Sequence, residues 1–167
     1  MTGIFLDQHE VRDGLVNGLA LGKSVLNMFS YTAAFSVAAA MGGAVETTSV
    51  DLAKRSRELS TAHFEANGFS MGNHRLVVMD VFDYFKYAKK KGLSYDLIVI
   101  DPPSFARNKK RTFSANKDYH KLIAQSLDIL SEHGTIIAST NAANMTVQQF
   151  KKQLRKGLGD VSADFVN

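Results

Sequence analysis

The chain has 167 residues, which is long enough for one domain with a substantial buried core. It contains no cysteine, which excludes disulfides, thiolate nucleophiles and cysteine-based metal sites within it and fits a reducing, cytoplasmic compartment. The net charge of +4 is compatible with an anionic partner, and no apolar run approaches the roughly 20 residues that a membrane-spanning helix needs.

Strands and helices are predicted to alternate along the chain. Strands are expected where short apolar runs stand between turn signals, over residues 24–29, 45–50, 75–79, 97–100 and 134–139. Helices are expected where apolar residues recur at helical spacing, over residues 10–21, 33–41, 52–67, 81–91, 116–130 and 146–156. This alternation predicts an α/β fold with a doubly wound, mostly parallel sheet. The longest irregular stretch, 104–115, is expected to be a mobile loop.

One stretch, residues 97–105, predicts where a ligand binds. Residues 97–100 are apolar without interruption, as in a strand that is buried on both faces. The run ends in Asp101, Pro102 and Pro103, and these are the only two prolines of the chain. Because proline lacks an N–H and disfavours helix at the residue before it, a stiff extended arm should leave the sheet at Asp101. Ligands of open α/β sheets bind at the carboxyl ends of such strands.

Three acids, Asp51, Asp80 and Asp101, each close a predicted strand. If the strands are parallel, all three carboxylates meet at one edge of the sheet. The first acid can accept hydrogen bonds from both hydroxyls of a ribose, and the second can accept one from an adenine amino group. Together they predict an adenosine pocket.

The turn after the first strand narrows the choice of adenosine ligand. It reads Phe29-Ser30-Tyr31-Thr32-Ala33-Ala34 and has no glycine, whereas a nicotinamide or flavin nucleotide needs Gly-x-Gly-x-x-Gly for its pyrophosphate. The chain also lacks the Gly-x-x-x-x-Gly-Lys-Ser/Thr loop of an ATP site. A ligand without phosphate, S-adenosylmethionine, fits these residues better. The histidines are too scattered along the chain to predict a metal site.

Three motifs, residues 2–8, 27–32 and 101–105, resemble the bacterial 23S ribosomal RNA large-subunit methyltransferases of the cytosine-C5 and guanine-N7 types. The resemblance implies a Rossmann-like class I methyltransferase fold, S-adenosylmethionine as cofactor, and 23S rRNA or a precursor of the large ribosomal subunit as partner. It implies that residues 1–167 are the catalytic domain of a longer protein, which would add an N-terminal RNA-binding domain of the PUA type and further C-terminal strands. The oligomeric state is left open, with a homodimer as one alternative.

The resemblance also implies roles for individual residues. Those implied for the cofactor are Phe5, Asp7, Gln8, Asn27, Phe29, Ser30, Tyr31, Thr32, Asp51, Leu52, Asp80, Val81 and Asp101. Residues 27–32 would line its methionine part, Asp51 would hold the ribose, and Asp80 with Val81 the adenine. Those implied for the reacting centre are Asp101, Pro102, Pro103 and Asn141. Two departures stand out: Ala33-Ala34 replaces the usual Gly-Gly, and His9 replaces an arginine.

The residues after the last predicted strand bear on which base is methylated. Cytosine C5 becomes nucleophilic only after a thiolate adds to C6, and this chain reads Ser139-Thr140-Asn141 where the cytosine-type relatives carry a cysteine. Guanine N7 needs neither covalent activation nor a base, and Asn141 can donate and accept at a base edge. Guanine N7 is therefore the preferred acceptor, cytosine C5 is the alternative, and an exocyclic amine ranks third.

A base within folded RNA must leave its stack before it can react, so aromatic and basic residues beside the arm are candidates for RNA binding. These are Phe105 and Tyr119 for stacking, and Arg107, Lys109, Lys110 and Arg111 for phosphates. The structural alternatives are a core position for Phe105 and a solvated loop for the basic run. A non-catalytic RNA-binding or assembly module and a small-molecule acceptor also stay open.

Overall fold

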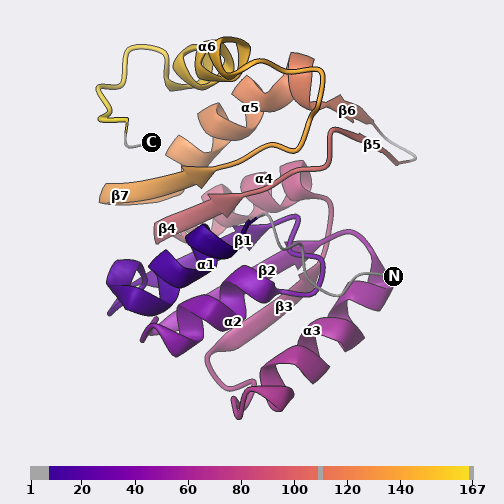
Figure 1. Cartoon of the computed structure of the whole chain (residues 1–167), viewed down its shortest axis with the longest axis vertical. Helices are drawn as coiled ribbons and strands as arrows, with labels where there is room; N and C mark the ends of the chain where they lie inside the picture. Colours follow the sequence, from indigo (N-terminus) through magenta and orange to yellow (C-terminus); the bar gives the residue numbers. More distant parts are fainter. Residues whose placement is uncertain (1–7, 109–110, 166–167) are drawn as a thin grey trace.

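The computed structural model describes residues 8–108 and 111–165. Its centre is a sheet of five parallel strands in the order β3-β2-β1-β4-β7 (Figure 1). The strands are β1 (Ser24–Met28), β2 (Glu46–Asp51), β3 (His74–Val78), β4 (Tyr95–Ile100) and β7 (Leu130–Ala138). The helices are α1 (His9–Gly14), α2 (Ala34–Met41), α3 (Lys54–Ala66), α4 (Val81–Lys91), α5 (Ala115–Leu127) and α6 (Val147–Leu158). The predicted doubly wound α/β fold is confirmed.

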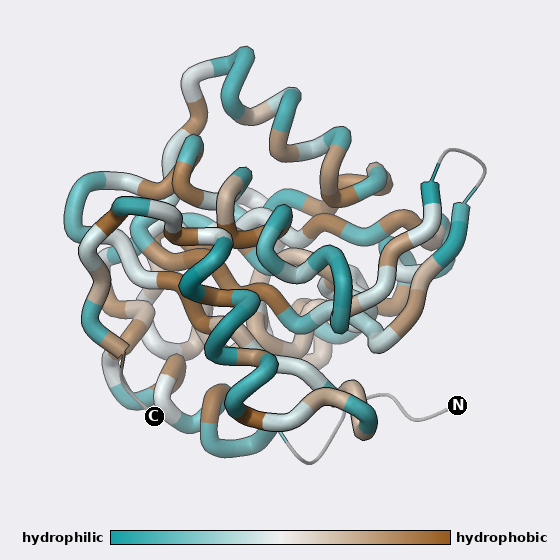
Figure 2. Tube along the Cα trace, turned by 90° about the horizontal axis from the view of Figure 1, so that it is seen from above, coloured by the Kyte–Doolittle hydropathy of each residue, from teal (hydrophilic) through white to brown (hydrophobic). Residues whose placement is uncertain are grey.

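Helices cover both faces of the sheet, with α1, α2 and α3 on one side and α4 and α5 on the other (Figure 1). On β4, Leu97 and Val99 pack into the cluster that contains α2, while Ile98 and Ile100 pack into the cluster that contains α4 and α5. Successive side chains of a strand point to opposite faces, so a strand covered on both sides must be apolar throughout. Figure 2 shows these hydrophobic strands inside a more hydrophilic shell of helices.

Helix α6 lies beyond the sheet and packs on α5. The lack of a side chain at Gly157 allows the two helices to approach closely. A Cβ built at that position would lie 2.5 Å from the Cβ of Ile123 and 2.6 Å from the carbonyl oxygen of His120. Thr146 begins α6 with a capping box, in which its hydroxyl accepts from the backbone N–H of Gln149 and the Gln149 side chain accepts from the N–H of Thr146. Within the described residues, no helix is long and apolar enough to cross a membrane.

Two predictions of local structure are wrong. The helix expected over 10–21 is α1 followed by a short π-helical segment, η2 (Leu15–Leu19), because Asn17 and Gly18 leave helical geometry and Gly18 has φ of 120°. The stretch expected to be an irregular loop contains an antiparallel pair, β5 (Phe105–Arg107) and β6 (Thr112–Ser114). Each of these strands has only three residues, too few for an alternating pattern to be recognised.

Several boundaries also differ by a few residues. Strand β7 begins at Leu130, four residues before the predicted 134, and α5 accordingly ends at Leu127. Helix α3 begins at Lys54, because Leu52 and Ala53 form the turn that follows Asp51. None of these shifts moves the three acids away from the carboxyl edge of the sheet.

Candidate functional site

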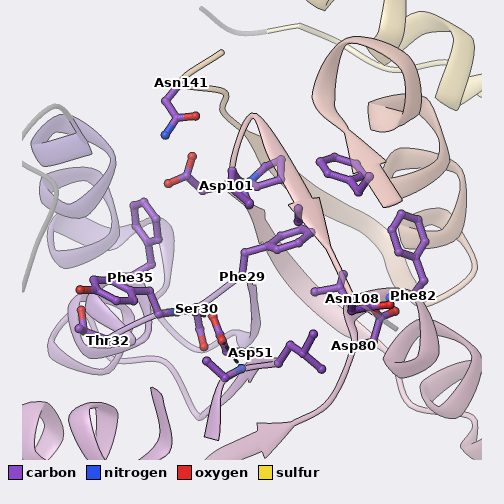
Figure 3. Close-up of a pocket in the computed structure, with 18 of the residues that line it drawn as sticks. Phe29, Ser30, Thr32, Phe35, Asp51, Asp80, Phe82, Asp101, Asn108 and Asn141 are labelled. Atoms are coloured by element: carbon purple, nitrogen blue, oxygen red, sulfur yellow. Dashed lines mark hydrogen bonds between the residues drawn. The ribbon is translucent and has the colours of Figure 1, made fainter. Parts of the chain in front are cut away.

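A cleft of about 480 Å³ opens at the carboxyl edge of the sheet. Its walls come from the loop after β1, the ends of β2 and β4, the start of α4, the β5–β6 hairpin, the loop after β7 and the beginning of α1. Figure 3 shows Phe29 in the middle of the site, with Asp51, Asp80 and Asp101 around it. The volume lies within the roughly 300–1,000 Å³ that small-molecule and cofactor sites occupy. The predicted convergence of the three acids is therefore observed.

The glycine-free turn after β1 has an unusual backbone. Phe29, Tyr31 and Ala33 all have positive φ, at 59°, 49° and 59°, a region that residues other than glycine, asparagine and aspartate seldom adopt. Neighbouring groups hold this conformation: the N–H of Tyr31 donates to Asp51 Oδ2 at 3.0 Å, and the N–H of Ala33 donates to the Ser30 carbonyl at 2.7 Å. Ala33, which replaces an expected glycine, thus lies where glycine would be unstrained.

Helix α3 supports the same turn from the side opposite the cleft. Ser60 Oγ donates to the Tyr31 carbonyl at 3.3 Å, and His63 Nδ1 lies 2.9 Å from the Thr32 carbonyl, which makes Nδ1 the protonated ring nitrogen. Ser30, Tyr31 and Thr32 line the cleft while α3 holds their backbone. The backbone of the turn is therefore hydrogen-bonded both to the end of β2 and to α3.

Asp51 also organises the loop that follows β2. Its Oδ1 accepts from the N–H of Ala53 at 2.8 Å, while Oδ2 accepts from Tyr31. The carboxylate and the adjoining Leu52 line the cleft, and Leu52 is 51% exposed. Asp51 thus joins the two loops at the β1 and β2 strand ends, and its role toward a ribose remains a prediction.

Asp80 has more hydrogen-bond partners than the sequence suggests. As the N-cap of α4, its Oδ1 accepts from the backbone N–H groups of Phe82 at 3.0 Å and Asp83 at 3.3 Å. Arg111 Nη1 donates to the same oxygen at 3.0 Å, and Asn108 Nδ2 donates to Oδ2 at 2.6 Å. Asp80 lines the cleft, but it also attaches the β5–β6 hairpin to α4.

Arg111, predicted to contact RNA phosphates, has an additional structural role that the sequence did not predict. Its guanidinium pairs with Asp80, lies 3.5 Å from Asp83 Oδ1, and stacks over the Phe82 ring at 4.6 Å from the centroid. Its side chain is only 28% exposed. Together with Asn108, Arg111 links the hairpin to the N-terminus of α4 and forms part of the cleft wall.

The proline arm forms another part of the wall. Asp101, Pro102 and Pro103 line the cleft, together with Asn141 from the loop after β7. Asp101 Oδ1 accepts a hydrogen bond of 2.5 Å from the Ser139 hydroxyl. Figure 3 shows the Asp101 carboxylate and the Asn141 amide turned toward the same part of the cavity. The structure thus brings together the residues predicted for the reacting centre.

Two further predicted residues do not reach the cleft. Asn27 is fully buried in β1, where its Nδ2 donates to Ser36 Oγ at 3.0 Å, so it lies behind the lining and does not face a ligand. Tyr119, expected to stack on RNA bases, is fully buried in α5, and its hydroxyl donates to the carbonyls of Ile100 and Ser139. The prediction for Tyr119 is wrong, because its buried hydroxyl bonds backbone carbonyls of the same fold. Asn27 is absent from the cleft lining, and its Oδ1 is buried without a hydrogen-bond partner.

Some of the other predicted site residues line the cleft, and others lie outside it or outside the described part of the chain. Gln8 and Val81, predicted for the cofactor, line the cleft. Arg107 lines it too, and its predicted contact with RNA phosphates stays a prediction. Phe105 is 60% exposed, which rules out the core position that was the alternative for it. The predictions for Phe5, Asp7, Lys109 and Lys110 lie outside the described residues.

Sequence reasoning missed several lining residues: Arg12, Phe35, Phe82, Asn108 and Phe113. Arg12 could have been found, because it stands four residues after Gln8 and such a pair shares one face of a helix. It brings a cation to the cleft wall, although the arginine expected at position 9 is replaced by His9. The three phenylalanines carry no local signal that separates a cleft wall from a core.

Comparison with known proteins decides the family. The model of the S-adenosylmethionine-dependent methyltransferases matches residues 1–156. The chain belongs to this family. The family resemblance predicted from the three motifs is thereby confirmed, and S-adenosylmethionine is the cofactor on which the family depends.

Individual relatives agree with this assignment. The chain is 55% identical to the "Putative ribosomal RNA large subunit methyltransferase YwbD" of Bacillus subtilis, over 90% of this chain and 38% of that protein. It is 40% identical to ribosomal RNA large subunit methyltransferase K of Neisseria meningitidis, over 84% of this chain and 40% of that protein. The crystal structure of SMU.776, described as "a putative methyltransferase complexed with SAH", matches with a TM-score of 0.97 and 72% identity, over 100% of this chain and 44% of that one. This methyltransferase chain therefore spans about two fifths of the length of the curated relatives it matches.

Proposed function

We propose that the protein transfers a methyl group from S-adenosylmethionine to a base of 23S rRNA, and that the cleft at the carboxyl edge of the sheet holds both the cofactor and the base. The observation that carries the proposal is the cleft itself, bordered by Asp51, Asp80 and the Asp101 arm in a chain of the methyltransferase family. The names of the relatives, which are ribosomal RNA large subunit methyltransferases, support the substrate class.

The residues of the cleft suit this cofactor by their chemistry. Asp51 can accept hydrogen bonds from ribose hydroxyls, Asp80 with the adjoining Val81 would meet the adenine, and Arg12 with Gln8 can meet a carboxylate. The turn from Ser30 to Thr32 would support the methionine part. When bound, S-adenosylmethionine supplies an electrophilic methyl group on a sulfonium. SMU.776, whose chain is 72% identical, was crystallised with SAH, which supports the same ligand class here.

The chain's own residues then have to orient the acceptor base. Methyl transfer is an in-line displacement, so the catalytic contribution is alignment and exclusion of water. Asp101 accepts hydrogen bonds, the proline arm offers carbonyls without donors, and the Asn141 amide does both. These groups can hold a base by its edge without activating it.

Guanine N7 is the acceptor that this arrangement supports best. The sequence after β7 has Thr140 and Asn141 and the chain has no cysteine, so no thiolate within it could add to a cytosine. N7 carries a lone pair in the ring plane and needs no base. The cytosine-C5 reaction is the alternative, and it would need a nucleophile from outside these 167 residues.

The exposed face of the β5–β6 hairpin is the proposed contact with RNA. Phe105, at 60% exposure, could stack on an unpaired base, and the exposed Arg107 lies beside it at the cleft. Because ribosomal RNA is the proposed acceptor, a cytoplasmic location and contact with a precursor of the large subunit follow as part of this proposal.

The test is methylation of unmodified 23S rRNA by the whole protein with labelled S-adenosylmethionine, followed by mass spectrometry of the nucleosides. New 7-methylguanosine supports the proposal, and new 5-methylcytidine overturns the choice of N7. Cofactor binding without label in any RNA overturns the proposed substrate and favours a small-molecule acceptor or a non-catalytic binding module. Asp101→Asn should abolish labelling, whereas Asp128→Asn, whose carboxylate pairs with Lys89 beyond the C-terminus of α5, should not.

A further inference from the structure

The strands β4 and β7 part from each other at the cleft. They are paired as far as Ile100 and Ala138, and the N–H of Ser139 adds one more ladder bond to the Ile100 carbonyl at 3.0 Å. Beyond this point one chain continues as the Asp101 arm and the other as the loop that carries Asn141, and both line the cleft. We call this separation of β4 and β7 after Ile100 and Ser139 the fork. Its geometry determines the positions of the Asp101 carboxylate and the Asn141 amide.

The fork is held from behind by a buried tyrosine. The Tyr119 hydroxyl lies 2.9 Å from the carbonyl oxygen of Ile100 and 2.8 Å from that of Ser139, so one donor joins the ends of both strands. Tyr119 is fully buried, and the Phe150 ring of α6 packs edge-on against it at 4.9 Å. Burial raises the pKa of Tyr119 well above its ordinary value, so the hydroxyl keeps its proton as a donor.

The Ser139 side chain connects this fixed point to the carboxylate. Its hydroxyl donates to Asp101 Oδ1 at 2.5 Å. Ser139 itself does not line the cleft. The backbone of Ser139 is therefore held by Tyr119 and Ile100, while its side chain gives the Asp101 carboxylate one fixed hydrogen-bond donor.

We propose that Ser139 is a positioning residue for methyl transfer, which holds the Asp101 carboxylate in the orientation that meets the acceptor base. The inference rests on the proposed function of the cleft. Ser139 acts through Asp101 and touches neither cofactor nor base. Its loss should lower the rate of a correctly bound complex much more than it weakens cofactor binding, because the ribose and adenine positions lie elsewhere in the cleft.

The chain provides a matched control on the same two strands. Ser131, near the start of β7, donates its hydroxyl to Asp96 Oδ1 on β4 at 2.7 Å, at the edge of the sheet opposite the cleft. Ser131→Ala and Ser139→Ala thus each remove one serine–aspartate bond between β4 and β7. A purely structural role would give both variants the same phenotype.

The experiment compares kcat and the dissociation constant for S-adenosylhomocysteine in the whole protein. Ser139→Ala should lower kcat about tenfold or more, since small misplacements at a reacting centre are costly, with the dissociation constant changed less than about twofold. Ser139→Thr should restore most of the rate, and Ser131→Ala should keep it. Equal rates for the two alanine variants would overturn the proposal.

A crystal structure of Ser139→Ala gives an answer that needs no activity. The Asp101 carboxylate should turn out of its parental position, whereas a parental position would overturn the role of Ser139. If the parent protein methylates no RNA, the proposed function fails, and this structure still decides the inference.

Discussion

Ala33 has a backbone conformation that suits glycine better than a residue with a Cβ atom. It is fully buried and has φ of 59°, a left-handed conformation that costs a residue with a Cβ roughly 1–2 kcal/mol. The neighbouring bonds to Ser30 and Asp51 hold the turn in spite of this cost. Strained residues of this kind cluster at ligand sites, where the surrounding structure determines them.

Ala33→Gly should therefore leave the free energy of unfolding nearly unchanged. Relief of strain offsets the loss of a buried methyl group, about 0.8 kcal/mol, and the higher backbone entropy of glycine. Ala39→Gly is the control, because Ala39 is equally buried in the regular part of α2 and should cost about 2 kcal/mol. Urea denaturation measures both changes. Similar losses at the two positions would show that Ala33 is not strained.

At the scale of elements, Asp96 links three strands at the amino edge of the sheet. Its carboxylate accepts from the N–H and hydroxyl of Ser24 on β1, at 2.9 and 2.8 Å, and from Ser131 on β7. The pairing of β4 with β7 is irregular between Tyr95 and Leu97, where the ladder skips residues of β7. The side chain of Asp96 thus connects strands at the place where the backbone ladder is interrupted.

These donors, first the backbone N–H of Ser24 and then the hydroxyls of Ser131 and Ser24, lower the pKa of Asp96 below its ordinary value of 3.8. A lowered native pKa stabilises the fold above the unfolded pKa, and this stabilisation is lost as the pH falls through the native pKa. Asp96→Asn should accordingly be less stable than the parent at pH 7, with the difference shrinking below about pH 4. Thermal unfolding between pH 3 and pH 7 measures it. A difference that is constant across this range would contradict the role of the ionised carboxylate.

The β5–β6 hairpin has two faces with different roles. Phe113 is buried against Phe29 and Phe82, with ring centroids 6.0 and 6.1 Å away, while Phe105 on the other strand is exposed. Asn108 and Arg111 attach the hairpin to Asp80. One face therefore completes the cleft, and the other presents an aromatic ring to the surroundings.

Phe105→Ala should weaken binding of single-stranded RNA by about 1–3 kcal/mol, the usual contribution of one stacked base. Because the ring is exposed, the free energy of unfolding should change little. Phe105→Tyr retains a stacking surface and should bind RNA as the parent does. Filter binding at a stated salt concentration provides the comparison, and full affinity in the alanine variant would exclude Phe105 from the RNA contact.

At the scale of the whole molecule, the cleft is built from segments that are distant in the sequence. A ligand bound there would connect the loops after β1, β2, β4 and β7 with the hairpin and α1. Such a ligand stabilises the native state by an amount that depends on its concentration relative to the dissociation constant. The melting temperature therefore reports on the proposed cofactor without requiring an RNA substrate.

S-adenosylhomocysteine at one hundred times its dissociation constant should raise the melting temperature by about 5–10 °C. Asp51→Ala should lose most of this shift at the same ligand concentration. Glu46→Ala should keep it, because Glu46 is at the other end of β2, beside Arg75. An unchanged shift in Asp51→Ala would exclude that carboxylate from the cofactor site.

Most of the architecture follows from local patterns in the sequence. The apolar run before Asp101 predicted a doubly covered strand, and the prolines predicted an arm at its carboxyl end; both are present. The acids at positions 51, 80 and 101 were expected to converge because parallel strands place their carboxyl ends at one edge. These features depend on residues that are close in sequence, where spacing alone carries the information.

The sequence by itself therefore determined the fold, the edge that holds the site and the family to which the chain belongs. Only the tertiary structure decided which polar side chains bond to other groups of the same protein and which face the cleft or the surface. Tyr119 is buried beneath the fork of β4 and β7, and Arg111 pairs with Asp80, which lies 31 positions earlier in the chain. A tyrosine or an arginine has the same local pattern whether its partner is a base, a phosphate or a carbonyl of the same protein. The partner is set by packing between distant segments, which spacing along one segment does not encode.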